Sequence, residues 1–310
     1  MKTLVLVNPA SARGQTGRRW PQLQGEFRKH LGDFDLAVTD RALHAGELVR
    51  DAILRGVERI ISVGGDGTNH EVLQGFFDPL TRQALNPEVG FAFVSSGTGG
   101  DFGRTLQVER RVDRQLERIV QSPGDQRIDL ISCTFVDDDG PAWRVCLNAA
   151  GVGHGGDLAR RVQAWKWLGG GGLPFVCAGI AGAIQISPWE VEVRVDDGPW
   201  QQRVVRNLAA FNGQFQGGGM RFAPLAALDD GQLELLFLGP LSPIVSISVG
   251  IASYAMDISD FDDVELRPSR RVELRPLPGQ PPMWVELDGE SPGQAPVTYE
   301  VMPGALRLAM

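Results

Sequence analysis

Residues 59–72 hold the pattern that most constrains the fold of this chain: an apolar run, a glycine turn and a helix-forming segment. The run RIISV is short and rich in β-branched residues, as buried strands are. The turn GGDG places three glycines within four positions, so the backbone can bend sharply and approach a ligand without a Cβ in the way. Thr68 lies three residues before Glu71, the spacing of a capping box, which predicts a helix start there. This succession indicates an α/β unit.

The same turn is suited to bind an anion, because free backbone N–H groups and the positive end of the macrodipole face one point at a helix N-terminus. Its single carboxylate, Asp66, cannot help to bind a bare phosphate. The carboxylate fits if a Mg²⁺ ion, a ribose hydroxyl or an acceptor hydroxyl shares the site. The turn therefore indicates nucleotide chemistry, although many such turns in α/β proteins are only tight connections.

The first part of the chain, to about residue 122, alternates strand-like and helix-like segments, which predicts a parallel sheet covered by helices. We expect strands at 4–7, 34–38, 59–63 and 89–94, and helices at 18–31, 45–54, 69–76 and 111–120. Polar loops follow the first and last of these strands, at 8–14 and 95–104. Because ligands bind outside the carboxyl ends of parallel strands, these loops and the glycine turn can meet in space.

After the turn at 122–125 the pattern changes to short apolar runs separated by Gly, Pro or Asp turns. We expect strands at 127–132, 143–148, 190–195, 204–211, 233–237, 264–266, 272–274 and 283–287, with helices near 152–186 and 241–253. This pattern predicts a mainly antiparallel β-sandwich or barrel-like sheet. Because 310 residues exceed what one core usually supports, we divide the chain into a nucleotide-binding α/β domain, 1–124, and a β-rich domain, 125–310. Whether the last residues return to the first domain stays open.

Four motifs occur in a fixed order along the chain: NPAS at 8–11, GGDGT at 64–68, GTGGDF at 97–102 and DGE at 288–290. In this order they resemble the diacylglycerol kinase catalytic family, and more narrowly the soluble bacterial lipid kinases related to sphingosine and ceramide kinases. The resemblance runs nearly end to end, through 212–219 and 224–231. One residue departs from it: the family's usual asparagine after GTG is Gly100 here, which puts in doubt a side-chain contact but not the backbone turn.

The resemblance implies transfer of the ATP γ-phosphoryl group to a lipid hydroxyl, diacylglycerol or a related lipid, bound by the second domain. The residues expected to bind the nucleotide are Asn8, Thr39, Gly64, Gly65, Asp66, Gly67, Thr68, Asn69 and Thr98. Glu290 of the DGE turn would take the proton from the acceptor hydroxyl, as the family implies. Asp288 and Asp66 are rivals for that role or for binding a catalytic Mg²⁺ ion.

A second, structural Mg²⁺ site is also implied by the resemblance. It would consist of Asp230 and the flanking backbone carbonyls of Ala227 and Gln232. Carboxylates are hard ligands that suit Mg²⁺. The alternative is that Asp229-Asp230-Gly231 forms only a hairpin turn.

Charge and residue content exclude several other classes of function. A formal net charge of −8 argues against a nucleic-acid partner, which requires a basic face. The four histidines show no paired ligand spacing and there is no CxxC, which argues against zinc. Cys133, Cys146 and Cys177 lie in apolar contexts and are expected to be buried thiols in a reducing compartment. The first strand follows Met1 so closely that no signal peptide fits, which predicts a cytoplasmic protein.

The most apolar segment, 168–186, is interrupted by glycines and a proline and is too short to span a bilayer, which needs roughly 20 apolar residues. It is either a buried helix of the second domain or a flexible wall that accepts acyl chains. Trp165 and Trp167, with cationic residues nearby, are typical of a membrane interface, but they would also suit an interface between two domains. We expect transient contact with a membrane surface, where the protein would be peripheral during turnover, and unpaired sheet edges would allow a homodimer.

Two other functions stay open at this point. The chain could phosphorylate a soluble acceptor such as NAD, because NAD kinases share the GGDGT turn, although they would not explain the other three motifs. Alternatively it could be a nucleotide-binding regulator that has lost catalysis, as the departure at Gly100 would allow. The intact Asp66, Asp288 and Glu290 argue against a regulator.

Overall fold

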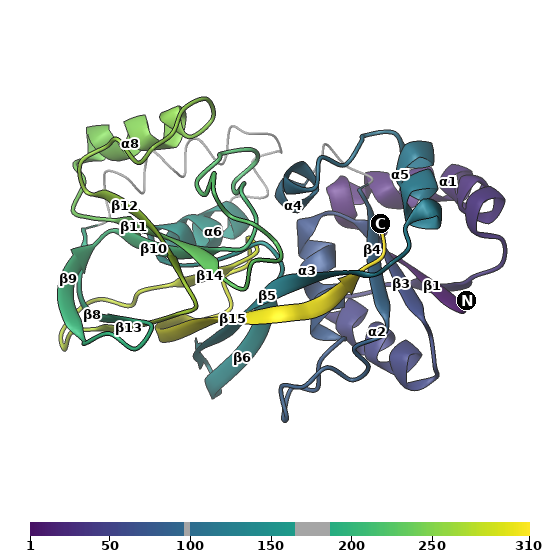
Figure 1. Ribbon diagram of the computed structural model, residues 1–310, viewed down its shortest axis with the longest axis horizontal. Coiled ribbons are helices and arrows are strands. Elements are labelled where there is room, and N and C mark those ends of the chain that lie inside the picture. The colour runs from purple at the N-terminus through teal and green to yellow at the C-terminus, as the bar shows by residue number, and fades with distance from the viewer. Residues whose placement is uncertain (96–99, 165–186) are drawn as a thin grey trace. The chain divides into compact units, whose positions relative to one another are not determined.

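The computed structural model describes residues 1–95, 100–164 and 187–310. Within these residues the chain forms two compact units, whose elements are labelled in Figure 1. The first unit comprises Met1–Leu130 and Pro303–Met310, and the second comprises Ile131–Met302. Thr98 and the apolar segment 168–186, with the two tryptophans before it, lie outside the described residues.

The first unit contains a parallel sheet in the order β2-β1-β3-β4, as the alternation of segments predicted. Its strands are β1 (Thr3–Val7), β2 (Asp35–Val38), β3 (Arg59–Gly64) and β4 (Gly90–Ser95). Strands β1 and β3 are buried along their whole length, whereas β2, at the edge, is mostly exposed. Central strands without an exposed face are typical of parallel sheets that helices cover on both sides.

Helices connect the successive strands of this sheet, and two more follow its strand β4 (Figure 1). They are α1 (Gln15–Leu31), α2 (His44–Leu54), α3 (Asp66–Gln74), α4 (Asp101–Thr105) and α5 (Val112–Gln121), with the 3-10 helix η1 (Ser11–Gly14) before α1. The short helix α4 was not predicted. The end of strand β15 (Gln294–Leu308) belongs to this unit, where Arg307 and Leu308 pair in parallel with β4.

The capping-box prediction for Thr68 is wrong. Helix α3 begins at Asp66, Gly65 is its N-cap, and no side chain caps it. Thr68 lies inside the first turn because its side chain is engaged elsewhere: it is buried, packs on Gly64 and accepts a hydrogen bond from Asn8.

The second unit is an antiparallel β-sandwich, which confirms the predicted fold class. One sheet has the order β12-β11-β10-β7-β14, formed by Val264–Ser269, Leu233–Leu238, Asn207–Phe211, Ala149–Gly153 and Val285–Leu287. The other contains β9 (Gln201–Val205), β8 (Trp189–Val195), β13 (Arg271–Pro276) and the first part of β15, with β5 (Gln126–Asp137) and β6 (Gly140–Cys146) also paired. Buried apolar side chains of both sheets form one core.

Two helices of this unit have bounds within the described residues. Helix α6 (His154–Ala164) packs on β7 and β14, and helix α8 (Pro243–Ala252) packs through Val249 on a second apolar cluster that includes Phe211 and Leu236. Among the described residues, no helix combines the length and hydropathy needed to cross a bilayer.

The second unit departs from the prediction at β7, at β9 and β10, and at β15. Residues 204–211 comprise the end of β9 and the whole of β10, separated by the buried Arg206. Strand β7 occupies 149–153, where we expected a helix from 152. Strand β15 was missed because Pro296, Pro303 and Gly304 interrupt its sequence, and these residues usually argue against a strand interior.

Candidate functional site

In the first unit, Asn8 joins the loop after β1 to the loop after β3. Its backbone N–H donates to the carbonyl of Val63 at 3.1 Å, and its side-chain Nδ2 donates to Oγ1 of Thr68 at 3.0 Å. Its Oδ1 accepts the N–H of Ala10 at 3.0 Å. Both ends of the amide are therefore engaged within the protein. Asn8 fixes the geometry of two loops at the carboxyl edge of the sheet, which is the edge where parallel sheets bind ligands.

The two glycines before helix α3 have different roles. A Cβ on Gly64 would lie 2.3 Å from Oγ1 of Thr68, so glycine is required there for packing. A Cβ on Gly65 would meet no atom within 4 Å, and the φ of −119° is one that any residue adopts. Gly65 therefore leaves open space at the helix N-terminus, where the first N–H groups of α3 have no carbonyl partner within the helix. This arrangement suits a phosphate group.

Two other predicted nucleotide-binding residues, Thr39 and Asn69, are buried. Thr39 follows β2, and its N–H donates to the carbonyl of Val7 at 3.0 Å, which places it beside the end of β1. Asn69 lies in α3, and its Oδ1 is buried with no hydrogen-bond partner in the part of the chain that the structure describes. Thr39 and Asn69 thus lie at the carboxyl edge of the sheet, although both are buried.

Asp66 packs against Gly100, and this contact gives a physical reason for the departure from the family's asparagine. Oδ2 of Asp66 accepts the N–H of Asp101 at 2.9 Å, at the first turn of α4. A Cβ at position 100 would lie 2.0 Å from Oδ1 of Asp66. A side chain at position 100 is therefore incompatible with this placement of the carboxylate, which connects the glycine turn to the start of α4.

In the second unit, the DGE motif forms a two-residue hairpin turn after β14. Leu287 N–H donates to the carbonyl of Glu290 at 2.7 Å, and Glu290 N–H donates to the carbonyl of Leu287 at 2.9 Å. Asp288 and Gly289 have φ values of 48° and 92°, as a turn of this kind requires at both central positions. The turn places Glu290 opposite Leu287, the last residue of a buried strand, and Glu290 is half-buried.

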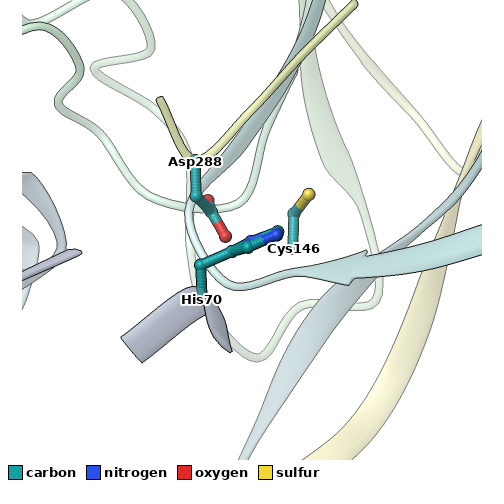
Figure 2. Close-up of side chains that lie close together, drawn as sticks. All are labelled: His70, Cys146 and Asp288. Atoms are coloured by element: carbon teal, nitrogen blue, oxygen red, sulfur yellow. The ribbon is translucent and has the colours of Figure 1, made fainter. Parts of the chain in front are cut away.

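The carboxylate of Asp288 binds three consecutive backbone N–H groups, those of Leu147, Asn148 and Ala149, at 2.9, 2.9 and 3.0 Å. Its own N–H donates to the carbonyl of Ala149 at 2.9 Å. Figure 2 shows the Asp288 side chain at the turn and the buried Cys146, the residue just before this segment. A carboxylate offers about four acceptor positions, and at least three are engaged here. Asp288 therefore anchors the turn to the start of β7.

Sequence analysis did not identify Glu286, a carboxylate in the same strand that is only 5% exposed. Its Oε1 accepts the N–H of Gly289 at 2.6 Å, and its Oε2 accepts a hydrogen bond from Nε2 of Gln216. The signal that could have found it is the sequence VELDGE itself. A glutamate between two core residues of a short strand either faces solvent or is buried with partners, and sequence alone favours solvent.

The segment proposed for a structural metal contains a turn that is stabilised without an ion. Oδ1 of the exposed Asp230 accepts the N–H of Gln232 at 2.9 Å, and Gly231 has a φ of 71°. The nearby Glu234 in β11 is buried, and burial, together with the negative charge of Asp230, raises the pKa of its carboxyl. Carboxylates are the kind of ligand that a hard cation such as Mg²⁺ prefers, and Asp230 stays the predicted ligand.

Cys133 and Cys146 are buried, and burial raises the pKa of the Cys133 thiol. Their burial agrees with the prediction, and Cys177 lies outside the described residues. His154, at the start of α6, has its pKa lowered to about 4 by burial and by the charge of Arg206, so it is neutral at pH 7.

Two family models together match most of this chain. The diacylglycerol kinase catalytic domain matches residues 2–133, and the YegS C-terminal NAD kinase beta sandwich-like domain matches residues 148–310. The chain belongs to the diacylglycerol kinase family with a YegS-type C-terminal domain. Membership agrees with the order of motifs and with the two folds described above.

Curated relatives and a solved structure are similar to this chain over most of its length. A protein from Xanthomonas euvesicatoria pv. vesicatoria, named "Probable lipid kinase YegS-like", is 27% identical over 284 residues, covering 92% of this chain and 89% of its own. One of the same name from Chromohalobacter salexigens is 29% identical over 265 residues, covering 84% and 79%. A solved diacylglycerol kinase from Bacillus anthracis str. Sterne has a TM-score of 0.69 at 18% identity, covering 98% of this chain and 95% of that one. At that identity the structure shows the fold alone.

The two glycines give a matched test of the turn. Gly65→Val should remain folded and weaken nucleotide binding about tenfold or more, because the branched side chain would occupy the open side of the turn. Gly64→Val should instead destabilise the fold by about 1–3 kcal/mol, because its side chain would collide with Thr68. Nucleotide titration and thermal unfolding separate the two effects. Unchanged nucleotide affinity in folded Gly65→Val would remove the phosphate-loop assignment.

The family's usual asparagine, placed at position 100, should destabilise this protein. Gly100→Asn should break the hydrogen bond between Asp66 and Asp101 and cost about 1–3 kcal/mol of stability, with a loss of activity. Gly25→Asn in α1 is the control, since a Cβ there meets no atom within 4 Å. Chemical denaturation measures the stability change. A Gly100→Asn variant as stable and active as the parent would show that the contact with Asp66 is dispensable.

Proposed function

We propose that this protein transfers the γ-phosphoryl group of ATP to the hydroxyl of a lipid, most simply diacylglycerol or a related lipid. The observation that carries the proposal is the open glycine turn at the N-terminus of α3, in a chain of the diacylglycerol kinase family. The names of the relatives support a lipid acceptor over a soluble one. The DGE turn, with a half-buried Glu290 held by two backbone hydrogen bonds, supports catalysis over a purely regulatory role.

Phosphoryl transfer depends mainly on positioning and charge stabilisation, and this chain provides groups for both. The N–H groups at the start of α3 would hold the phosphates, while Asn8 and Thr68 keep the surrounding loops in place. The lipid oxygen forms a bond to the γ-phosphorus as the bond from that phosphorus to the β–γ bridging oxygen breaks, and ADP leaves. The proton of the lipid hydroxyl passes to the carboxylate of Glu290.

Glu290 is our choice of proton acceptor because the resemblance implies that role for it, whereas its two rivals hold backbone N–H groups. Asp288 accepts three N–H groups, and Asp66 accepts the N–H of Asp101 while packing on Gly100. Mg²⁺, when bound, would neutralise charge on the phosphates or, at Asp230, stabilise the second unit. Asp66 stays our candidate for the residue that binds the catalytic Mg²⁺ ion.

The lipid acceptor implies a transient encounter with a membrane surface, and we propose that it takes place in the cytoplasm. Helix α8 supports such contact, since it has no charged residue and exposes Ile244 and Ile251 by 77% and 69%. A homodimer stays a prediction from the unpaired sheet edges.

One experiment separates the proposed function from its rivals. Purified protein is incubated with γ-labelled ATP and either a total lipid extract or NAD. A labelled lipid supports the proposal, and a labelled NADP would establish the soluble acceptor instead. Nucleotide binding without any labelled product would favour a regulator.

The two carboxylates of the DGE turn should respond differently to amide substitution. Glu290→Gln keeps the size of the side chain but cannot accept a proton, so kcat should fall by roughly 10²–10⁴-fold with stability unchanged. Asp288→Asn should lower the free energy of unfolding by about 1–3 kcal/mol, because an amide has a single oxygen for three N–H donors. Steady-state kinetics measure kcat, and urea unfolding measures the free energy of unfolding, for both variants. Near-full turnover in Glu290→Gln, with a loss in Asp66→Asn, would move the base to the glycine turn.

Asp230→Asn tests the structural ion. If Mg²⁺ binds there, the variant should lose activity through weaker retention of the ion, and excess Mg²⁺ should partly restore it. Activity is measured across a Mg²⁺ titration, with Asp229→Asn as the neighbouring control. An Asp230→Asn variant whose Mg²⁺ dependence equals that of the parent would leave Asp230 as a turn residue only.

A further inference from the structure

The segment 212–219, NGQFQGGG, has no role in the reaction described so far, yet it is firmly attached to the start of β7. The N–H groups of Asn212 and Gly213 donate to the carbonyl of Asn148 at 2.9 and 3.0 Å. The side-chain Nδ2 of Asn148 donates to the carbonyl of Phe215 at 2.8 Å. The N–H of Asn148 is one of the three that Asp288 binds. The same residue therefore holds both the DGE turn and this segment.

The end of the segment is a loop of three glycines that carries no side chain. Gln216 and Met220 exchange backbone hydrogen bonds of 2.9 and 3.1 Å, which closes the loop at its base. Between them, Gly217, Gly218 and Gly219 have φ values of 67°, 91° and 113°. Residues with a Cβ rarely adopt such values, so the loop requires glycine. Met220 packs against Gly217, but a Cβ on Gly218 would meet no atom within 4 Å, so another molecule can approach the backbone closely at Gly218.

Glu286 connects this loop to the DGE turn. Its side chain points away from the core that its neighbours Val285 and Leu287 enter, as alternation along a strand requires. One carboxylate oxygen accepts the N–H of Gly289, and the other accepts Nε2 of Gln216, at the base of the loop. Residue 151, opposite in β7, is glycine, and a Cβ there would lie in van der Waals contact with Oε2, at 3.4 Å.

We propose that Glu286 is a positioning residue for phosphoryl transfer, and that the loop 217–219 forms one wall of the site for the lipid hydroxyl. This inference rests on the function proposed above. Gly289 directly precedes Glu290, so the bond from its N–H to Glu286 sets the direction in which the proposed base leaves the turn. Asp288 holds the turn on the side of β7, and Glu286 holds it on the side of the glycine loop.

A buried carboxylate is well suited to this task. Hydrogen bonds to an ionised acceptor are about twice as strong as those between neutral groups, and a buried charge requires such partners. The bonds from Gly289 and Gln216 supply them, so the loop and the turn stabilise each other. Displacement of either should misplace Glu290, and a shift of about 1 Å in a reacting group can cost on the order of 10²-fold in rate.

An exchange of the two side chains tests the connection. Glu286→Gln should keep both bonds, because the amide oxygen accepts from Gly289 and Gln216 can rotate its amide to accept in turn. Gln216→Glu places two carboxylates against each other and breaks the connection. The double variant Gln216→Glu with Glu286→Gln restores an amide–carboxylate pair with the roles reversed. Glu286→Leu removes the connection without adding charge.

The expected result is a loss of kcat with the lipid acceptor of about tenfold to 10²-fold in Glu286→Leu and in Gln216→Glu, with little change in KM for ATP. Glu286→Gln and the double variant should both lie within about threefold of the parent, which is the non-additivity expected of a directly coupled pair. Glu300→Leu is the matched control for Glu286→Leu, and Gln201→Glu is the control for Gln216→Glu. Both residues are at exposed strand positions of the same unit, so both substitutions should leave kcat unchanged.

A double variant as slow as Gln216→Glu alone would overturn the proposal. So would a fall in kcat that only matches a fall in the amount of folded protein, or one accompanied by an equally large rise in KM for ATP. Backbone hydrogen exchange of residues 285–290 adds a readout that needs no activity: protection should fall in Glu286→Leu and return in the double variant. If the parent phosphorylates no lipid, the proposed function fails, while hydrogen exchange still decides whether Glu286 holds the turn. Unchanged protection in Glu286→Leu would refute the positioning role.

Discussion

The DGE turn of the second unit depends on one polar contact, the carboxylate of Asp288 with three successive N–H groups of residues 147–149. Strand β14 is only three residues long and would have little hold on the sheet by ladder hydrogen bonds alone. The carboxylate adds charge-assisted bonds at its end and satisfies N–H groups where the chain passes from β6 to β7. It thereby fixes the one turn that carries the proposed base, Glu290. Polar groups in this unit thus serve first to build the scaffold on which Glu290 is placed.

The first unit uses the same arrangement with different groups. The amide of Asn8 and the carboxylate of Asp66 are engaged with neighbouring loops, through Thr68 and Asp101 respectively. What these side chains leave exposed is backbone: the open side of Gly65 and the start of α3. Since phosphate binding relies on N–H groups and the helix dipole, side chains are free to set loop geometry. Substitution of a motif residue can therefore act through loop position as much as through ligand contact.

The regular elements could be predicted because their signals are local. Buried strands such as 59–64 have continuous apolar sequences, and the glycine turn marks a helix N-terminus within one residue or two. The sequence could not show what depends on distant partners. Asp288 meets Leu147, which lies 141 positions earlier, and the roles of Glu286 and Gly100 exist only because Gln216 and Asp66 lie next to them. Thr68 matched a local pattern, but a tertiary hydrogen bond determined its position instead.

Residues 303–310 belong to the first unit, although they follow the whole of the second along the chain. There Arg307 and Leu308 pair with β4, Ala309 N–H donates to the carbonyl of Phe91 at 2.7 Å, and Gly304 N–H donates to Asp129 at 2.7 Å. The second unit is in effect an insertion within the first. During synthesis on the ribosome, the parallel sheet must wait for these residues before its final strand can be added. The sandwich waits for the first part of the same strand, because Val297–Glu300 pair with β13, so neither unit is complete until β15 has been made.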